Sequence, residues 1–110
     1  MKKVALPLVN HQLSERFEHC SDFIIFTIKK NNNTKMKLVK TNLQPMNFPN
    51  WLAEEGVTDI ITIGIENHSA SKLNRFKINV FAGVEPSDPE QLVEKFLNGT
   101  LETNVILEES

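Results

Sequence analysis

Four side chains in this sequence could bind a soft metal ion or a metallocluster: those of His11, His19, Cys20 and His68. A neutral imidazole and a thiolate are ligands that iron and other transition metals accept in proteins. The spacing matches no zinc pattern, because the sequence contains neither a C-x-x-C nor an H-x-x-x-H pair. His19 and Cys20 are adjacent, so these two are the first candidates for metal ligands. The other two histidines can add to them only if the fold brings them close.

The first half of the chain predicts three strands. Residues 3–9 (KVALPLV) are apolar on both faces, which is typical of a buried strand, and Pro7 predicts an irregularity within it. Residues 22–30 (DFIIFTIKK) are rich in aromatic and β-branched side chains. A turn at residues 31–34 (NNNT) leads to a third strand at residues 35–42 (KMKLVKTN), whose lysines protect a sheet edge.

The second half of the chain alternates helices and strands. Helices are predicted where a capping residue or a proline precedes an amphipathic stretch. Ser69 is the expected cap of the second helix, and Ser87 or Asp88 is the expected cap of the third. The predicted elements are a helix at 47–56, a strand at 58–65, a helix at 69–77, a strand at 78–84 and a helix at 87–99.

This order, β-β-β-α-β-α-β-α, predicts an α/β protein with a mixed five-stranded sheet and helices packed on its faces. The alternating half requires parallel strands that are joined by right-handed crossovers. Residues 1–102 form a single domain in this interpretation, and residues 103–110 form a loose acidic tail.

The predicted topology gathers the candidate ligands at one edge of the sheet. If the first strand is parallel to the fourth and antiparallel to the second, then His11, His19, Cys20 and His68 all lie at the same edge. Ligands of open α/β sheets bind there, outside the carboxyl ends of the parallel strands. Helix starts such as the one near Ser69 also direct free N–H groups to this edge, which favours an anionic ligand.

Composition limits the classes of function. The chain has 110 residues, 40% of them hydrophobic, and a net charge of −2, which is typical of one globular domain without a nucleic-acid footprint. No apolar run approaches the ~20 residues that span a bilayer. The short apolar segment after the N-terminal lysines is interpreted as the first strand, not as a signal peptide. A single cysteine cannot form an internal disulfide, and we expect a cytoplasmic protein.

Enzymatic activity is not expected. A metal-dependent nuclease needs several carboxylates on its central strands, and the first predicted strand has none. Asp22 and Asp59 lie at strand starts, where a solvated or turn-capping role is the ordinary one. Ser14, Glu66 and His68 could form a triad by residue type, but the G-x-S-x-G turn is absent, and so is any glycine-rich phosphate loop.

Three segments resemble the dinitrogenase iron-molybdenum cofactor family. LSERFEHCSDFIIFTI is similar to its S-x-x-F-G-x segment and following strand, WLAEEGVTDIITIGI to its L-x-x-x-G-V-D-V-V-I-x-G stretch, and INVFAGVEPSDPEQLVEKFLNGTLE to its G-I-x-V-Y-x-G segment and closing helix. The resemblance covers nearly the whole chain in the right order. It implies a ribonuclease-H-like fold without nuclease activity, in a bacterial or archaeal accessory protein of nitrogenase cofactor assembly. It also implies that the histidine of the matching loop, here His19, contacts a cluster.

Two positions depart from the pattern of that family. Glu18 replaces the glycine after Phe17, and Asn67 stands where a second glycine is usual. Because a sulfide cluster is anionic, the carboxylate of Glu18 predicts repulsion at the binding loop. Asn67 tolerates left-handed backbone better than most residues do.

Two functions remain open. The first is non-catalytic binding and carriage of an iron-sulfur or molybdenum-type metallocluster, or of its precursor. His19 and Cys20 would be the metal ligands, with His11 and His68 beside them, and the partners would be cluster-assembly proteins. The second is a ligand-free protein-interaction or regulatory module on the same fold. We expect a monomer or a weak homodimer, since an edge strand can pair two chains.

Overall fold

A computed structural model describes residues 1–31, 33–104 and 107–108. Within this part of the chain, the main sheet has six strands and the path β4-β3-β1-β5-β7, and β2 pairs with β1 beside this path. β1 is antiparallel to β3 and parallel to β5, so the mixed sheet expected from the sequence is confirmed. The strands are β1 (Lys2–Val9), β2 (Gln12–Leu13), β3 (Asp22–Ile28), β4 (Thr34–Lys40), β5 (Asp59–Ile61) and β7 (Asn79–Phe81).

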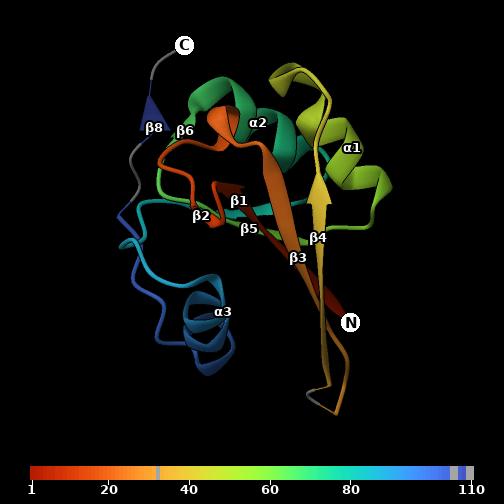
Figure 1. The fold of residues 1–110 in the computed structure, drawn as a ribbon, viewed down its shortest axis with the longest axis vertical. Helices are drawn as coiled ribbons and strands as arrows, with labels where there is room; N and C mark the ends of the chain where they lie inside the picture. The colour runs from red at the N-terminus through yellow and green to blue at the C-terminus, as the bar shows by residue number, and fades with distance from the viewer. Residues whose placement is uncertain (32, 105–106, 109–110) are drawn as a thin grey trace.

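Helices cover both faces of this sheet. Figure 1 shows α1 (Phe48–Glu54) and α2 (Asn67–Arg75) together on one face, and α3 (Pro89–Asn98) on the other. Two short 3-10 helices, η1 (Phe17–His19) and η2 (Pro45–Asn47), precede β3 and α1. None of the helices in the described ranges is long and apolar enough to cross a membrane.

Each face of the sheet has its own hydrophobic core. On the α1/α2 face, the rings of Phe17, Phe23 and Phe48 contact one another with centroids 5.3–5.8 Å apart. Trp51 is half-buried against Phe23. The buried apolar residues of the α3 face are Val4, Leu6, Phe26, Ile28, Ile61, Val84, Leu92 and Val93. Burial of this apolar surface is the main source of stability for both layers.

The main sheet differs from the prediction in two respects. It contains six strands and not five, because β2 folds back onto the end of β1 through the pairs Leu8–Leu13 and Val9–Gln12. The irregularity expected at Pro7 is also absent, since β1 and β3 pair without interruption from Lys2 to Leu8. The carbonyl oxygen of Pro7 accepts a hydrogen bond from the Ser14 N–H at 2.8 Å, so the backbone polar groups of Pro7 face away from β3. The missing N–H of proline therefore removes no bond between β1 and β3.

The parallel strands are shorter than expected, and α2 begins earlier. Only three residues of the predicted strand at 58–65 belong to β5, and a separate strand, β6 (Ile65–Glu66), follows it. The prediction of Ser69 as a helix cap is wrong, because this serine lies buried inside α2 and Glu66 occupies the cap position. The helix therefore begins at Asn67, two residues before the predicted start at residue 69.

The C-terminal segment lies against the body of the protein in its described part, although the sequence predicted a loose tail. The Asn104 N–H donates to the carbonyl of Gly83 at 3.1 Å, and β8 (Leu107–Glu108) pairs in parallel with β6. A Cβ atom on Gly83 would overlap the backbone carbonyl of Asn104, so the approach requires glycine. Residues 105, 106, 109 and 110 lie outside the described residues.

Candidate functional site

The loop that carries His19 and Cys20 is fastened to the end of the central parallel strands. The N–H of Phe17 donates to the Gly64 carbonyl at 2.8 Å, and the N–H of Gly64 donates to the Glu15 carbonyl at 3.0 Å. A Cβ atom on Gly64 would lie 2.9 Å from that Glu15 oxygen, so only glycine allows this close approach. The start of β3 and the region after β5 therefore share one edge of the sheet, as the topology predicted.

His19 and Cys20 lie at the end of η1, at this edge and on the α1/α2 side. His19 is exposed, while Cys20 is half-buried against the core that contains Phe17. Burial raises the pKa of the Cys20 thiol from 9.0 to about 12; the backbone hydrogen bond at Cys20 opposes this, and the nearby Asp22 and Glu18 carboxylates add to it. The thiol therefore keeps its proton at neutral pH, and a metal must displace that proton in order to bind sulfur.

His68 lies on the same side of the sheet as His19 and Cys20. It is the second residue of α2, and its side chain is exposed. Because α2 packs on the α1/α2 core through Ala70 and Leu73, its first turn lies in the same layer as η1. A hydrogen bond from the N–H of Glu66 in β6 to the carboxylate of Glu18 in η1 connects the two segments.

His11 lies on the opposite side of the sheet, at the same edge. Asn10 and His11 form the two-residue turn between β1 and β2, with φ values of 51° and 65°. Both positive angles are typical of the tight hairpins that follow the twist of the strands. The side chain of His11 lines a groove together with Asp88 and Pro89 at the start of α3. The fold thus separates His11 from the other three candidates.

No closed metal site is present in the residues that the structure describes. No group of three or more His, Cys, Asp or Glu side chains there is close enough to hold a metal ion. His19 and Cys20 can still offer one imidazole and one sulfur from adjacent positions. Such a pair is open on its remaining sides, so any metal bound there needs further ligands of its own.

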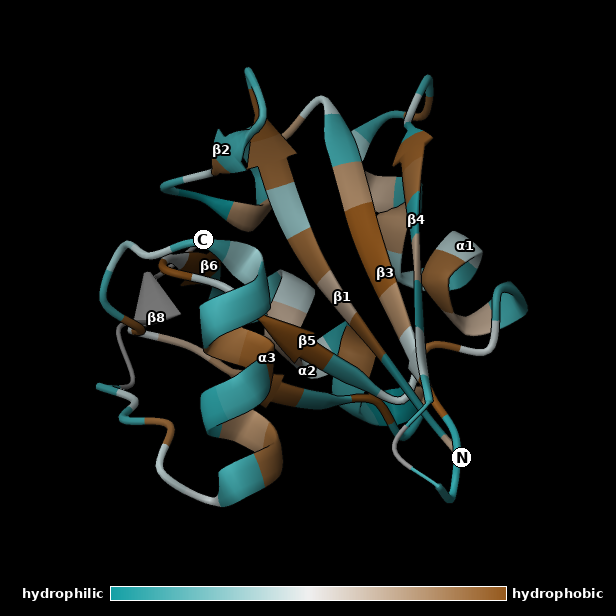
Figure 2. Cartoon of the chain, turned by 60° about the horizontal axis from the view of Figure 1, so that its bottom comes forward, coloured by the Kyte–Doolittle hydropathy of each residue, from teal (hydrophilic) through white to brown (hydrophobic). Residues whose placement is uncertain are grey.

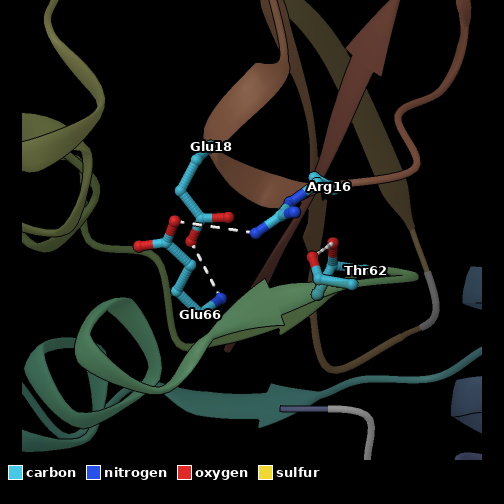
Figure 3. A network of polar contacts seen from close by, with 5 residues as sticks. Arg16, Glu18, Thr62 and Glu66 are labelled. Atoms are coloured by element: carbon cyan, nitrogen blue, oxygen red, sulfur yellow. Dashed lines mark hydrogen bonds and ion pairs between the residues drawn. The ribbon is translucent and has the colours of Figure 1, made fainter. Parts of the chain in front are cut away.

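A polar network occupies the start of α2, next to η1 (Figure 3). The Oε2 atom of Glu18 accepts from the backbone N–H of Glu66 at 3.1 Å, and an Arg16 nitrogen lies 3.6 Å from a carboxylate oxygen of Glu66. The other oxygen of Glu18 is buried, without a hydrogen-bond partner among the described residues. A carboxylate of the chain itself therefore fills the position at which an anion would meet the start of this helix.

Sequence reasoning did not find this network. Glu18 and Glu66 are 48 residues apart, and neither belongs to a motif that indicates a contact. The one available signal was the departure from the family pattern at Glu18, which predicted repulsion of a cluster but not a bond to α2. The structure shows that the carboxylate of Glu18 accepts a hydrogen bond from the Glu66 N–H at the start of α2.

The comparisons with known proteins agree with this architecture. Residues 1–99 match the family described as dinitrogenase iron-molybdenum cofactor. The search of curated proteins returned no match. Among solved structures, the protein PH0822 has a TM-score of 0.83 and 21% identity over 93% of this chain and 96% of that one.

Two further solved structures share the fold at low identity. The apo form of the orange protein from Desulfovibrio gigas has a TM-score of 0.74 and 18% identity, over 96% of this chain and 94% of that one. The protein MJ0327 from Methanocaldococcus jannaschii has a TM-score of 0.74 and 22% identity, over 93% of each chain. These likenesses concern the fold, whereas the family match covers residues 1–99 in sequence. The chain belongs to the dinitrogenase iron-molybdenum cofactor family.

Proposed function

We propose that this protein binds an iron-sulfur or molybdenum-type metallocluster, or its precursor, and carries it without catalysis. The family name and the similarity to the apo form of the orange protein support a cofactor-related role. The observation that carries the proposal is the adjacent pair His19 and Cys20, held at the carboxyl edge of β1 and β5 by the bonds between the η1 segment and Gly64. We place this carrier in the cytoplasm, between cluster-assembly proteins.

The open geometry suits a cargo that arrives already assembled. Two protein ligands cannot build a cluster from free ions, but they can hold one whose inorganic sulfides complete the metal coordination. His19 is exposed and can reach a ligand without movement of the core, whereas the half-buried thiol of Cys20 must first lose its proton. Such weak, proton-coupled binding fits transfer to a partner better than permanent storage.

We assign the two other histidines smaller roles. His68 lies in the same layer as His19 and is the next ligand in this proposal. His11 faces the α3 side, so we expect it to contribute least. Its imidazole at the same edge makes the His11→Ala variant a matched control for His19→Ala.

Anaerobic reconstitution tests the proposal. The protein is incubated with iron and sulfide, or with tetrathiomolybdate, and desalted before its visible absorption is recorded. We expect charge-transfer bands for the wild-type protein and for His11→Ala, and their loss in His19→Ala and Cys20→Ala. A colourless wild-type protein, or bands that survive both substitutions in the loop, would contradict the carrier function.

One observation favours the alternative of a ligand-free interaction or regulatory module. The carboxylate of Glu18 already bonds to the start of α2, which places negative charge beside the candidate ligands. Under this alternative, wild-type protein stays colourless, and the Glu18→Gln variant stays colourless too. Colour that appears only after Glu18 is replaced would instead indicate a family binding site that this residue has closed.

A further inference from the structure

A groove runs along α3 on the face of the sheet opposite the candidate cluster ligands. Figure 2 shows α3 beside β1, while β3 and β4 have no helix over them on this face. Two adjoining hollows, of about 600 and 370 Å³, share Met36 and Glu90 in their walls and so form one continuous groove. The sheet therefore has a complete layer of two helices on one face and about half a layer on the other.

The floor of this groove is apolar and partly exposed. Leu8, Ile24 and Phe26 line it from β1 and β3. On β4, Met36 and Leu38 remain 54% and 50% exposed. Large apolar side chains that gather in one hollow mark a binding surface more often than isolated ones do.

The wall of the groove that α3 forms is acidic. Glu90 and Glu94 both line the groove, and their spacing of four residues places them on one side of the helix, above Leu97. Asp88 adds a third carboxylate at the end near His11. Neither Glu90 nor Glu94 forms an ion pair or hydrogen bond with the described residues, so this row of charge has no partner within that part of the chain.

We propose that this groove binds an amphipathic helix of a partner protein, whose apolar stripe lies on β3 and β4 and whose lysines or arginines face Glu90 and Glu94. Such a helix would complete the layer that α3 begins. Helices in one layer lie about 8–10 Å apart, which brings side chains on their facing edges into ion-pair distance. The stretch from Glu90 to Leu97 spans about 10 Å, or two helical turns, and matches a short helix.

Neither the last ten residues nor helix α1 or α2 of a second copy fits this groove. The last ten residues, LETNVILEES, contain three glutamates and no lysine or arginine, so their charge is wrong for an acidic wall. In a second copy, α2 has Lys72 and Arg75, but its apolar residues Ala70 and Leu73 are buried against its own core. α1 contains no basic residue. A basic helix from another protein is the occupant that the charges favour.

Fluorescence anisotropy with designed peptides tests this proposal on the whole protein. The first probe is a helix of about 15 residues with leucines at i, i+3, i+4 and i+7 and lysines along one flank of that stripe. The second has glutamates in place of the lysines. We expect the lysine peptide to bind at least about tenfold more tightly, because the glutamate peptide meets like charges.

Variants locate the binding to the groove. The double variant Glu90→Lys/Glu94→Lys should reverse the preference and bind the glutamate peptide more tightly. Leu38→Asp, an exposed site whose change should not prevent folding, should weaken both peptides about tenfold or more. Glu85→Lys, an exposed charge outside the groove, should change neither affinity.

Three results would overturn the proposal. These are equal affinity for both peptides, binding that the Leu38→Asp and charge-reversal variants leave unchanged, and no measurable binding of either peptide. Light scattering gives the remaining check. A wild-type dimer that Leu38→Asp converts to monomer would show that a second copy of the chain, and not a basic helix, covers the groove.

Discussion

Replacement of Glu18 should have two opposite effects: it should lower the stability of the fold and strengthen the binding of an anionic cluster. The Oε2 atom of Glu18 accepts the Glu66 N–H, whereas its Oε1 atom is buried without a hydrogen-bond partner in the described part of the chain. Loss of a hydrogen bond to a charged group costs about 1.5–3 kcal/mol. Removal of a buried oxygen without a partner offsets part of that loss. We therefore expect Glu18→Ala to lower the free energy of unfolding by about 1–2 kcal/mol, and Glu18→Gln, which keeps an acceptor, by about half as much.

The same substitutions should strengthen the binding of an anionic cluster. A unit charge about 10 Å away contributes about 1.7 kcal/mol at an effective dielectric constant of 20, and salt at about 0.1 M reduces this to about 0.6 kcal/mol. The expected gain in affinity is then about threefold. Urea unfolding measures the stability, and titration with tetrathiomolybdate, followed by absorption, measures the affinity.

Glu15→Gln is the matched control, because it removes the same charge from an exposed side chain three residues away. It should leave the free energy of unfolding unchanged within about 0.5 kcal/mol. The reasoning about Glu18 is refuted if Glu18→Ala is as stable as the wild type, or if both Glu18 variants bind the anion less tightly than the Glu15 control does.

Three further predictions concern other parts of the fold. Gly64→Ala should lower the free energy of unfolding by about 1–3 kcal/mol in urea titrations, because a Cβ atom there would lie 2.9 Å from the Glu15 carbonyl oxygen. The same substitution should displace η1 and so reduce cluster binding. Asp59→Ala should cost about 2–3 kcal/mol, since this buried carboxylate accepts hydrogen bonds from Thr58 at 2.6 Å and from Asn79 at 3.1 Å. It lies at the opposite end of β5, so the folded variant should bind the cluster normally. Because burial raises the pKa of Cys20 from 9.0 to about 12, the native state holds this proton more tightly than the unfolded chain. The contribution of Cys20 to the free energy of unfolding is complete below pH 9 and falls as the pH rises toward 12. This fall should appear in the difference between wild type and Cys20→Ala, because the variant has no thiol to titrate.

The order of the elements and the shared edge could be predicted because both follow from local patterns. Apolar and β-branched runs marked β1, β3 and β5, and chain connectivity then restricted how these strands could pair. Once β1 is parallel to β5 and antiparallel to β3, the positions of His19 and His68 at one edge follow from topology alone. No side-chain detail is needed for that conclusion.

The side of the sheet on which each ligand lies could not be predicted in this way. His11 turns toward α3 because two consecutive residues adopt positive φ and fold β2 back onto β1. Neither residue of that turn is glycine, so the usual signal for such a hairpin is missing. The bond from Glu66 to Glu18 depends on tertiary contacts between segments 48 residues apart, which local patterns do not encode.

Side-chain nitrogen resonances of the three histidines test the proposed cluster ligands most directly. Protein labelled with ¹⁵N-histidine has only three imidazoles, so the addition of a cluster source under anaerobic conditions gives a spectrum that can be assigned with one variant per residue. The carrier function predicts that a ring nitrogen of His19 shifts or broadens strongly, that His68 changes less, and that His11 stays in place. Visible absorption bands that appear while His19 is unchanged, or a response confined to His11, would contradict it.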